Sequence, residues 1–142
     1  MNERFPADWL TVREAADHAA RSEPLLNLLR DWCHGRKSLR IVDLGAGTGS
    51  NLRYLAPRLP LPQHWTLVDH DPDLLARVSA PDAAPPLTLS TVCADLAQWE
   101  LEVARPDLVT ASALLDLVSE SWLDRLVQSC IGQRAAVLLA LS

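Results

Sequence analysis

The sequence predicts a single α/β domain built on a doubly wound, mostly parallel β-sheet. Short apolar runs typical of buried strands recur along the chain, and stretches with apolar residues at helical spacing lie between several of them. A glycine-rich turn directly follows the first of these runs. Strands that alternate with helices predict right-handed crossovers and a sheet covered on both faces. A chain of 142 residues is long enough for one such domain with a hydrophobic core.

Two helices are expected before the first strand, within residues 1–36. Thr11 and Glu14 have the spacing of a capping box, and apolar residues follow them at helical spacing. In the second helix, Ser22 is the expected N-cap and Pro24 lies in the first turn, where proline is tolerated. The domain is therefore expected to open with a helical pair.

Residues 37–142 are expected to form the alternating β/α core, without a second domain. The helix after the second strand should begin behind Asp71 as its N-cap, and the helix before the fifth strand should end at Gly132. The five expected strands are LRIVDL (39–44), HWTLVD (64–69), LTLSTVC (87–93), DLVTAS (107–112) and AVLLAL (136–141).

The composition argues against several classes of partner. The formal net charge is −5 and no run of basic residues occurs, whereas nucleic-acid surfaces gather lysine and arginine. The N-terminal stretch lacks the apolar core of a signal peptide, and the longest apolar run, AAVLLAL (135–141), is far too short to span a bilayer. We therefore expect a small-molecule substrate, no nucleic acid, no membrane partner and a cytoplasmic location.

The cysteine pattern gives no indication of a metal site. Cys33, Cys93 and Cys130 are widely spaced and form no CxxC pair, which a zinc site typically requires. We expect no metal ion and three buried thiols in a reducing compartment.

The segment IVDLGAGTGSNL (41–52) predicts a turn in which a ligand approaches the backbone closely. A P-loop is excluded because no lysine follows Gly49. A dinucleotide fingerprint requires a glycine where Ser50 stands, and the carboxylate of Asp43 would repel a pyrophosphate. S-adenosylmethionine has no phosphate and carries cationic groups that an acidic side chain attracts. The turn therefore favours S-adenosylmethionine, with a NAD-linked oxidoreductase as the alternative.

The same segment resembles motif I of the class I S-adenosylmethionine-dependent methyltransferases, whose common form is hydrophobic-[DE]-x-G-x-G-x-G. Three later segments resemble the same family in the same order along the chain. They are TLVDHDPDLL (66–75), VCADLAQW (92–99) and DLVTASALLDLV (107–118). The resemblance implies a Rossmann-like methyltransferase core with strand order 3-2-1-4-5. It also implies S-adenosylmethionine as cofactor and S-adenosylhomocysteine as product.

For the first motif, the resemblance places the loop of Gly45, Ala46, Gly47 and Gly49 under the methionine moiety of the cofactor. Asp43 would accept from the amino group of that moiety, directly or through water. The alternative for Asp43 is a carboxylate that stabilises the dipole of the following helix.

For the second and third motifs, the resemblance assigns the ribose hydroxyls to Asp69 and the adenine to Asp95 and the backbone N–H of Leu96. His70 would lie beside the adenine, where a solvated loop histidine is the alternative. The alternative for Asp95 is a residue that only forms a turn. Asp71 suits the N-cap better than Asp69 does, because it directly precedes a proline.

The remaining assignments lie after the fourth strand and in the first helix. The resemblance places Ala111 and Ser112 at the methionine amino group, where a backbone carbonyl accepts. Either Arg13 or Arg21 could bind the cofactor carboxylate, although solvated surface charges are the alternative. No catalytic residue is assigned, because Asp116, the best-placed candidate for a base, is equally typical of a surface.

Family members usually continue after the fifth strand with a helix and two further strands. We therefore expect this chain to be a truncated domain, whose methyl acceptor is a small molecule and whose activity depends on the missing part. A non-catalytic domain that only binds S-adenosylmethionine is the alternative. The apolar fifth strand would then be an exposed edge, on which two copies could pair as a homodimer.

Overall fold

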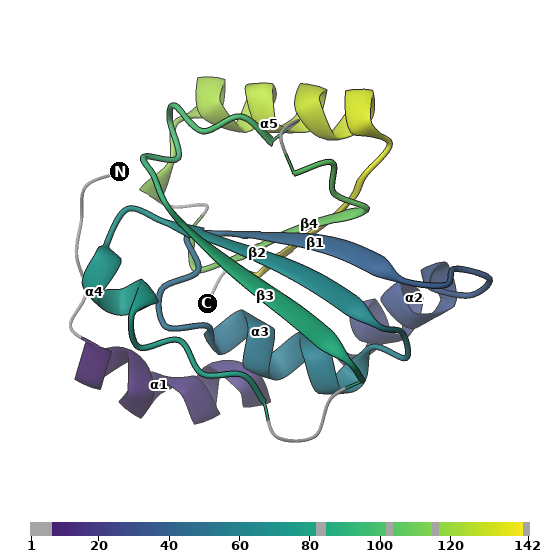
Figure 1. Ribbon diagram of the computed structural model, residues 1–142, viewed down its shortest axis with the longest axis horizontal. Coiled ribbons are helices and arrows are strands. Elements are labelled where there is room, and N and C mark those ends of the chain that lie inside the picture. The colour runs from purple at the N-terminus through teal and green to yellow at the C-terminus, as the bar shows by residue number, and fades with distance from the viewer. Residues whose placement is uncertain (1–6, 82–84, 102–103, 115–116, 141–142) are drawn as a thin grey trace.

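The computed structural model of the protein describes residues 7–81, 85–101, 104–114 and 117–140. Five parallel strands form one sheet in the order β3-β2-β1-β4-β5 (Figure 1). The predicted fold class and strand order are therefore confirmed. The strands are β1 (Leu39–Leu44), β2 (Gln63–Asp69), β3 (Leu87–Cys93), β4 (Leu108–Ser112) and β5 (Ala136–Ala140).

Helices cover both faces of the sheet. Helix α5 lies on one face, and α1, α3 and α4 lie on the other (Figure 1). The described part of the connection from β3 to β4 contains turns in place of an α-helix, so the alternation of strands and helices is incomplete. The helices are α1 (Ala7–Ala19), α2 (Glu23–Trp32), α3 (Ser50–Leu55), η1 (Ala56–Arg58, a 3-10 helix), α4 (Pro72–Leu75) and α5 (Glu120–Gln133).

The pleat of β1 divides the hydrophobic core into two clusters. Ile41 packs in a cluster with Leu52 of α3, while the next residue, Val42, packs in a second cluster with Trp122 of α5. All four side chains are nearly inaccessible to solvent. Because successive side chains of a strand point to opposite faces, Asp43 returns to the α3 face. This alternation determines where the acidic residue of the first motif lies.

The helical pair is present, but the predicted start of its first helix is wrong. Helix α1 already begins at Ala7, so Thr11 lies within it and donates its hydroxyl proton to the carbonyl of Ala7. Glu14 pairs with Arg53 of α3 and does not close a capping box. The N-cap of α2 is confirmed, since Ser22 accepts from a backbone N–H of the first turn.

Two further expectations need correction and one is confirmed. Helix α5 continues through Gly132 and ends against Arg134, whose φ of 54° reverses the chain as a C-terminal glycine would. Cys93 is exposed at the end of the edge strand β3, whereas Cys33 and Cys130 are buried. Asp71 caps α4 and accepts from two backbone N–H groups.

Strand β5 lies at the edge of the sheet opposite β3. Among the described residues it pairs only with β4, and the side chain of Val137 is 42% exposed. Leu141, the last residue of the expected strand, lies outside the described residues. Pairing of two copies along this edge stays a prediction. In the described part of the chain, no helix is both long and apolar enough to cross a membrane.

Candidate ligand-binding site

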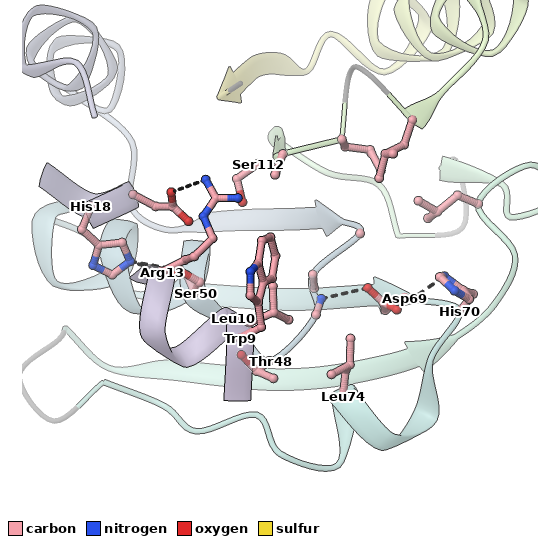
Figure 2. Close-up of a pocket in the computed structure, with 18 of the residues that line it drawn as sticks. Trp9, Leu10, Arg13, His18, Thr48, Ser50, Asp69, His70, Leu74 and Ser112 are labelled. Atoms are coloured by element: carbon pink, nitrogen blue, oxygen red, sulfur yellow. Dashed lines mark hydrogen bonds and ion pairs between the residues drawn. The ribbon is translucent and has the colours of Figure 1, made fainter. Parts of the chain in front are cut away.

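A cavity of about 370 Å³ lies at the carboxyl ends of the strands, between the glycine turn after β1, the ends of β2 and β4, and helix α1. This is the position where open α/β sheets bind their ligands. In Figure 2, Asp69 and His70 lie at one end of the cavity, His18 lies at the other, and Trp9 lies between them.

The cavity brings together seven of the eleven residues that the sequence assigned to a cofactor. Those on its wall are Gly45, Ala46, Gly47, Asp69, His70, Leu96 and Ser112. The other four, which do not line it, are Asp43, Gly49, Asp95 and Ala111.

The glycine turn is held against β2 by its own backbone. The N–H groups of Gly45 and Ala46 both donate to the carbonyl of Val68, at 2.8 Å and 3.0 Å. Gly45 has a φ of 68° and Gly47 a φ of 56°, in the left-handed region that side chains disfavour. A Cβ atom at Gly45 would lie 3.0 Å from Cδ1 of Leu114, in the loop after β4. The position therefore requires glycine for both its backbone conformation and its packing.

We expect Gly45→Ala to lower the free energy of unfolding by about 2 kcal/mol, from backbone strain and crowding against Leu114. Gly132→Ala is the matched control, because it lies inside α5 with no atom within 4 Å of its Cβ position. That substitution should raise the free energy of unfolding by up to about 1 kcal/mol. Urea denaturation measures both changes, and equal effects at the two glycines would contradict the requirement at Gly45.

Asp69, at the end of β2, is hydrogen-bonded to two turns that form the floor of the cavity: the glycine turn after β1 and the turn before α4. Its Oδ2 accepts from the N–H of Gly47 at 2.8 Å, and its Oδ1 accepts from the N–H of Asp71 at 2.9 Å. The imidazole Nδ1 of His70 lies 3.6 Å from Oδ1. A carboxylate offers about four acceptor positions, so the two backbone bonds leave capacity for further donors. The carboxylate on the cavity wall is thus fixed in place and still able to bind.

Asp43 lies beneath the cavity and is only 1% exposed. Its Oδ1 accepts from Nδ2 of Asn51 at 3.1 Å, whereas Oδ2 has no hydrogen-bond partner among the described residues. Burial raises the pKa of Asp43 to about 7, against the lowering effects of Asn51 and Arg21 and with a smaller contribution from Asp69. The residue can therefore influence a ligand through its charge but does not form the wall.

The two residues assigned in the third motif lie in different places, one on the cavity wall and one at the protein surface. Asp95 is exposed, and its Oδ1 accepts from the N–H of Ala97 at 2.9 Å, which is the turn-forming arrangement. Leu96 lies on the cavity wall together with Leu74 of α4, and both side chains are apolar.

The two residues assigned at the end of β4 also lie in different places. Ala111 is buried in the core cluster under α5, while Ser112 reaches the cavity wall. Gly49 has a φ of 92° and forms the N-cap of α3, away from the wall. Asp116 lies outside the described residues. Among the residues that are described, no group of three or more His, Cys, Asp or Glu is placed to hold a metal ion.

Helix α1 forms one wall of the cavity, and Arg13 is the residue of this helix that the sequence analysis named as a candidate for the site. It contributes no buried residue, yet its side chains Trp9, Leu10, Arg13, Asp17 and His18 line the cavity, as does Arg21 just beyond it. The guanidinium of Arg13 lies over the Trp9 ring at 4.8 Å and pairs with Asp17 at 3.1 Å. The spacing of Trp9, Arg13 and Asp17 by four residues was the available signal, since it puts them on one helix face.

Polar contacts attach α1 to the glycine turn and α3. Nη2 of Arg53 lies 2.6 Å from Oε1 of Glu14, and Nη1 of the same guanidinium donates to the carbonyl of Thr48 at 2.6 Å. Burial raises the pKa of Glu14, but the hydrogen bond and charge of Arg53 outweigh burial and hold the pKa below its usual value. His18 Nε2 also lies 3.0 Å from the carbonyl oxygen of Ser50. Side-chain contacts therefore hold α1, the roof of the cavity, against the glycine turn and α3, which lie below it.

A parallel sheet with a glycine turn after β1 and an acidic side chain ending β2 is typical of α/β proteins that bind nucleoside-containing ligands. Within that class, the sequence profile of a family described as methyltransferase domain matches residues 41–132, which is more than half of the chain. The chain belongs to this methyltransferase-domain family, and the resemblance seen in the four motifs is confirmed.

Solved structures agree with this assignment. A methyltransferase from Mesorhizobium loti, described as S-adenosylmethionine-dependent, is 25% identical with a TM-score of 0.57, over 86% of this chain and 54% of that one. The plantazolicin methyltransferase BpumL, solved with S-adenosylhomocysteine, is 16% identical with a TM-score of 0.53, over 87% and 50%. Phosphoethanolamine N-methyltransferase 1 of Haemonchus contortus is 16% identical with a TM-score of 0.59, over 91% and 26%.

The two more distant structures show the shared fold alone. The chain spans about half the length of the first two proteins and about a quarter of the third. No curated protein sequence matches the chain significantly.

Proposed function

We propose that this chain binds S-adenosylmethionine and serves a methyltransferase that acts on a small-molecule acceptor. The observation that carries this proposal is the carboxylate of Asp69, fixed on the cavity wall by the N–H of Gly47 at 2.8 Å. This contact puts an anchored acceptor for hydroxyl groups beside a glycine turn that admits a ligand to the backbone.

The residues of the cavity fit the parts of this cofactor. Asp69 has the remaining capacity to accept from both ribose hydroxyls. Leu74, which lies on the same side of the cavity as Asp69 in Figure 2, and Leu96 of the cavity wall offer apolar surfaces to the adenine ring. The cofactor carries a methyl group activated by its sulfonium, so the protein has to supply binding and alignment and no covalent chemistry. The glycine turn and Ser112 would hold the methionine moiety, away from the adenine.

Two other functions are weaker. A NAD-linked oxidoreductase is not favoured, because the methyltransferase-domain family matches the chain and the buried carboxyl of Asp43 lies beneath the turn where a pyrophosphate would lie. A domain that binds the cofactor without catalysing methyl transfer would have the same site as an enzyme and would differ from it only in activity. The net charge of −5 supports a small-molecule acceptor over a nucleic acid, and the three widely spaced cysteines suit the reducing cytoplasm.

Titration calorimetry with S-adenosylhomocysteine and with NAD tests the proposal. We expect saturable binding of S-adenosylhomocysteine with one site per chain and no binding of NAD at the same concentrations. Binding of NAD alone would overturn the proposal. Methyl transfer to candidate small acceptors, assayed on the whole protein, then distinguishes an enzyme from a binding domain.

A further inference from the structure

Asn51, in the first turn of α3, is a buried polar residue to which no role has been assigned. It is only 2% exposed, and its side-chain amide contacts three separate parts of the fold. Nδ2 donates to Oδ1 of Asp43 on β1 at 3.1 Å and to Oγ1 of Thr110 on β4 at 2.9 Å. Oδ1 accepts from Nη1 of Arg21, between α1 and α2, at 2.9 Å. Three of the four hydrogen-bonding positions of this amide are therefore used by these groups.

The orientation of this amide follows from the chemistry of its neighbours. A guanidinium can only donate, so the group that faces Arg21 must be the carbonyl oxygen of Asn51. The NH2 group then faces β1 and β4, where Asp43 and Thr110 are direct neighbours in the register of the sheet. Two acceptors side by side on the strands match the two protons of one NH2 group. Serine, leucine or aspartate at position 51 would not satisfy all three partners.

The side-chain amide of Asn51 lies between the guanidinium of Arg21 and the carboxyl group of Asp43. The guanidinium of Arg21 lies on the cavity wall and over the ring of Tyr54, at 4.3 Å from its centroid. On the other side of the amide, Oδ2 of Asp43 is buried and has no partner among the described residues. Arg13, the other arginine of the wall, already pairs with Asp17. The arrangement therefore places a guanidinium on the cavity wall and an acidic group beneath that wall, on opposite sides of one amide.

An α-amino acid carries a carboxylate and an ammonium on one carbon, and this pair of opposite charges matches the two groups on either side of Asn51. We propose that Asn51 is a positioning residue for the amino-acid end of the cofactor, holding Arg21 for the carboxylate and Asp43 for the ammonium. Arg21 contacts the ligand, whereas Asp43 acts through its charge from beneath the wall. This inference rests on the proposed function, because it concerns one end of the same ligand.

The test compares two ligands that differ only at that end. S-adenosylhomocysteine has the amino-acid group, and 5′-methylthioadenosine has the same nucleoside and a thioether without it. Asn51→Leu should weaken binding of S-adenosylhomocysteine by about 10-fold or more, since hydrogen bonds to charged groups are lost. Binding of 5′-methylthioadenosine should change less than about twofold, because the nucleoside does not depend on Asn51. Calorimetry measures both affinities.

Arg21→Gln provides the second variant in case Asn51→Leu does not fold. The glutamine amide can still donate to Asn51 but carries no charge, and it should show the same selective loss. An equal loss for both ligands, or no loss for either, would overturn the positioning role. Failure of the unmodified protein to bind either ligand would instead overturn the proposed function, and the two failures are thus distinguishable.

Discussion

Replacing Asp69 by alanine should weaken binding of S-adenosylhomocysteine by about 100-fold or more and lower the free energy of unfolding by about 3 kcal/mol. The affinity should fall because two charge-assisted hydrogen bonds to the ribose would be lost. The stability should fall because the N–H groups of Gly47 and Asp71 lose the carboxylate that accepts from them. Calorimetry and urea denaturation measure the two effects.

A role in binding the ribose has to be separated from a role in shaping the turn. Asp69→Asn keeps one carbonyl acceptor, and the 2′-deoxy analogue of S-adenosylhomocysteine removes one ribose hydroxyl. If Asp69 binds the ribose, the preference of the unmodified protein for the natural ligand should largely disappear in the asparagine variant. If the residue only shapes the turn, both ligands should weaken equally. Asp124→Ala, an exposed carboxylate on α5, is the control.

The second large effect concerns the pH dependence of stability. The pKa of Asp43 is about 7 in the folded protein, against an ordinary value of 3.8. Between these values the folded state binds one proton more than the unfolded state, so the stability contributed by this group is lost as pH rises toward and through 7. A difference of about 3 pH units corresponds to about 4 kcal/mol.

Urea denaturation from about pH 4 to about pH 8 measures this loss against Asp43→Asn, which cannot ionise. The unmodified protein should lose stability relative to the variant as pH rises, by about 4 kcal/mol over the full range. Parallel curves for the two proteins would show that the carboxyl of Asp43 titrates normally. Asp124→Asn should leave the pH dependence unchanged, since that side chain is exposed.

The strands and the glycine turn could be predicted because their signals are local, whereas the strand order followed from the family resemblance. The run LRIVDL, the three glycines and the acidic end of β2 each occupy a few consecutive residues, and parallel topology then brings their ends together. The position of α1 could not be predicted in the same way. Its cavity-facing side chains are mostly polar or aromatic, and none of its residues packs in the core.

The buried polar network was also missed, although its signal is visible in the sequence. Asp43 and Thr110 are buried polar residues inside mostly apolar strands, and adjacent strands place them side by side. A buried polar group requires a partner, so two of them on one face indicate a third polar side chain on the helix above. Asn51 is that side chain, but its identity depends on how α3 packs, which spacing alone does not determine.

The contact between Asp69 and Gly47 has a consequence for how a ligand is received. Together with the bonds from Gly45 and Ala46 to Val68, it orders the floor of the cavity during folding, so little conformational entropy is left to lose on association. The roof differs, because α1 adheres through side-chain contacts and buries no residue of its own. A ligand therefore meets a base that is already ordered and a covering helix that is held by side-chain contacts.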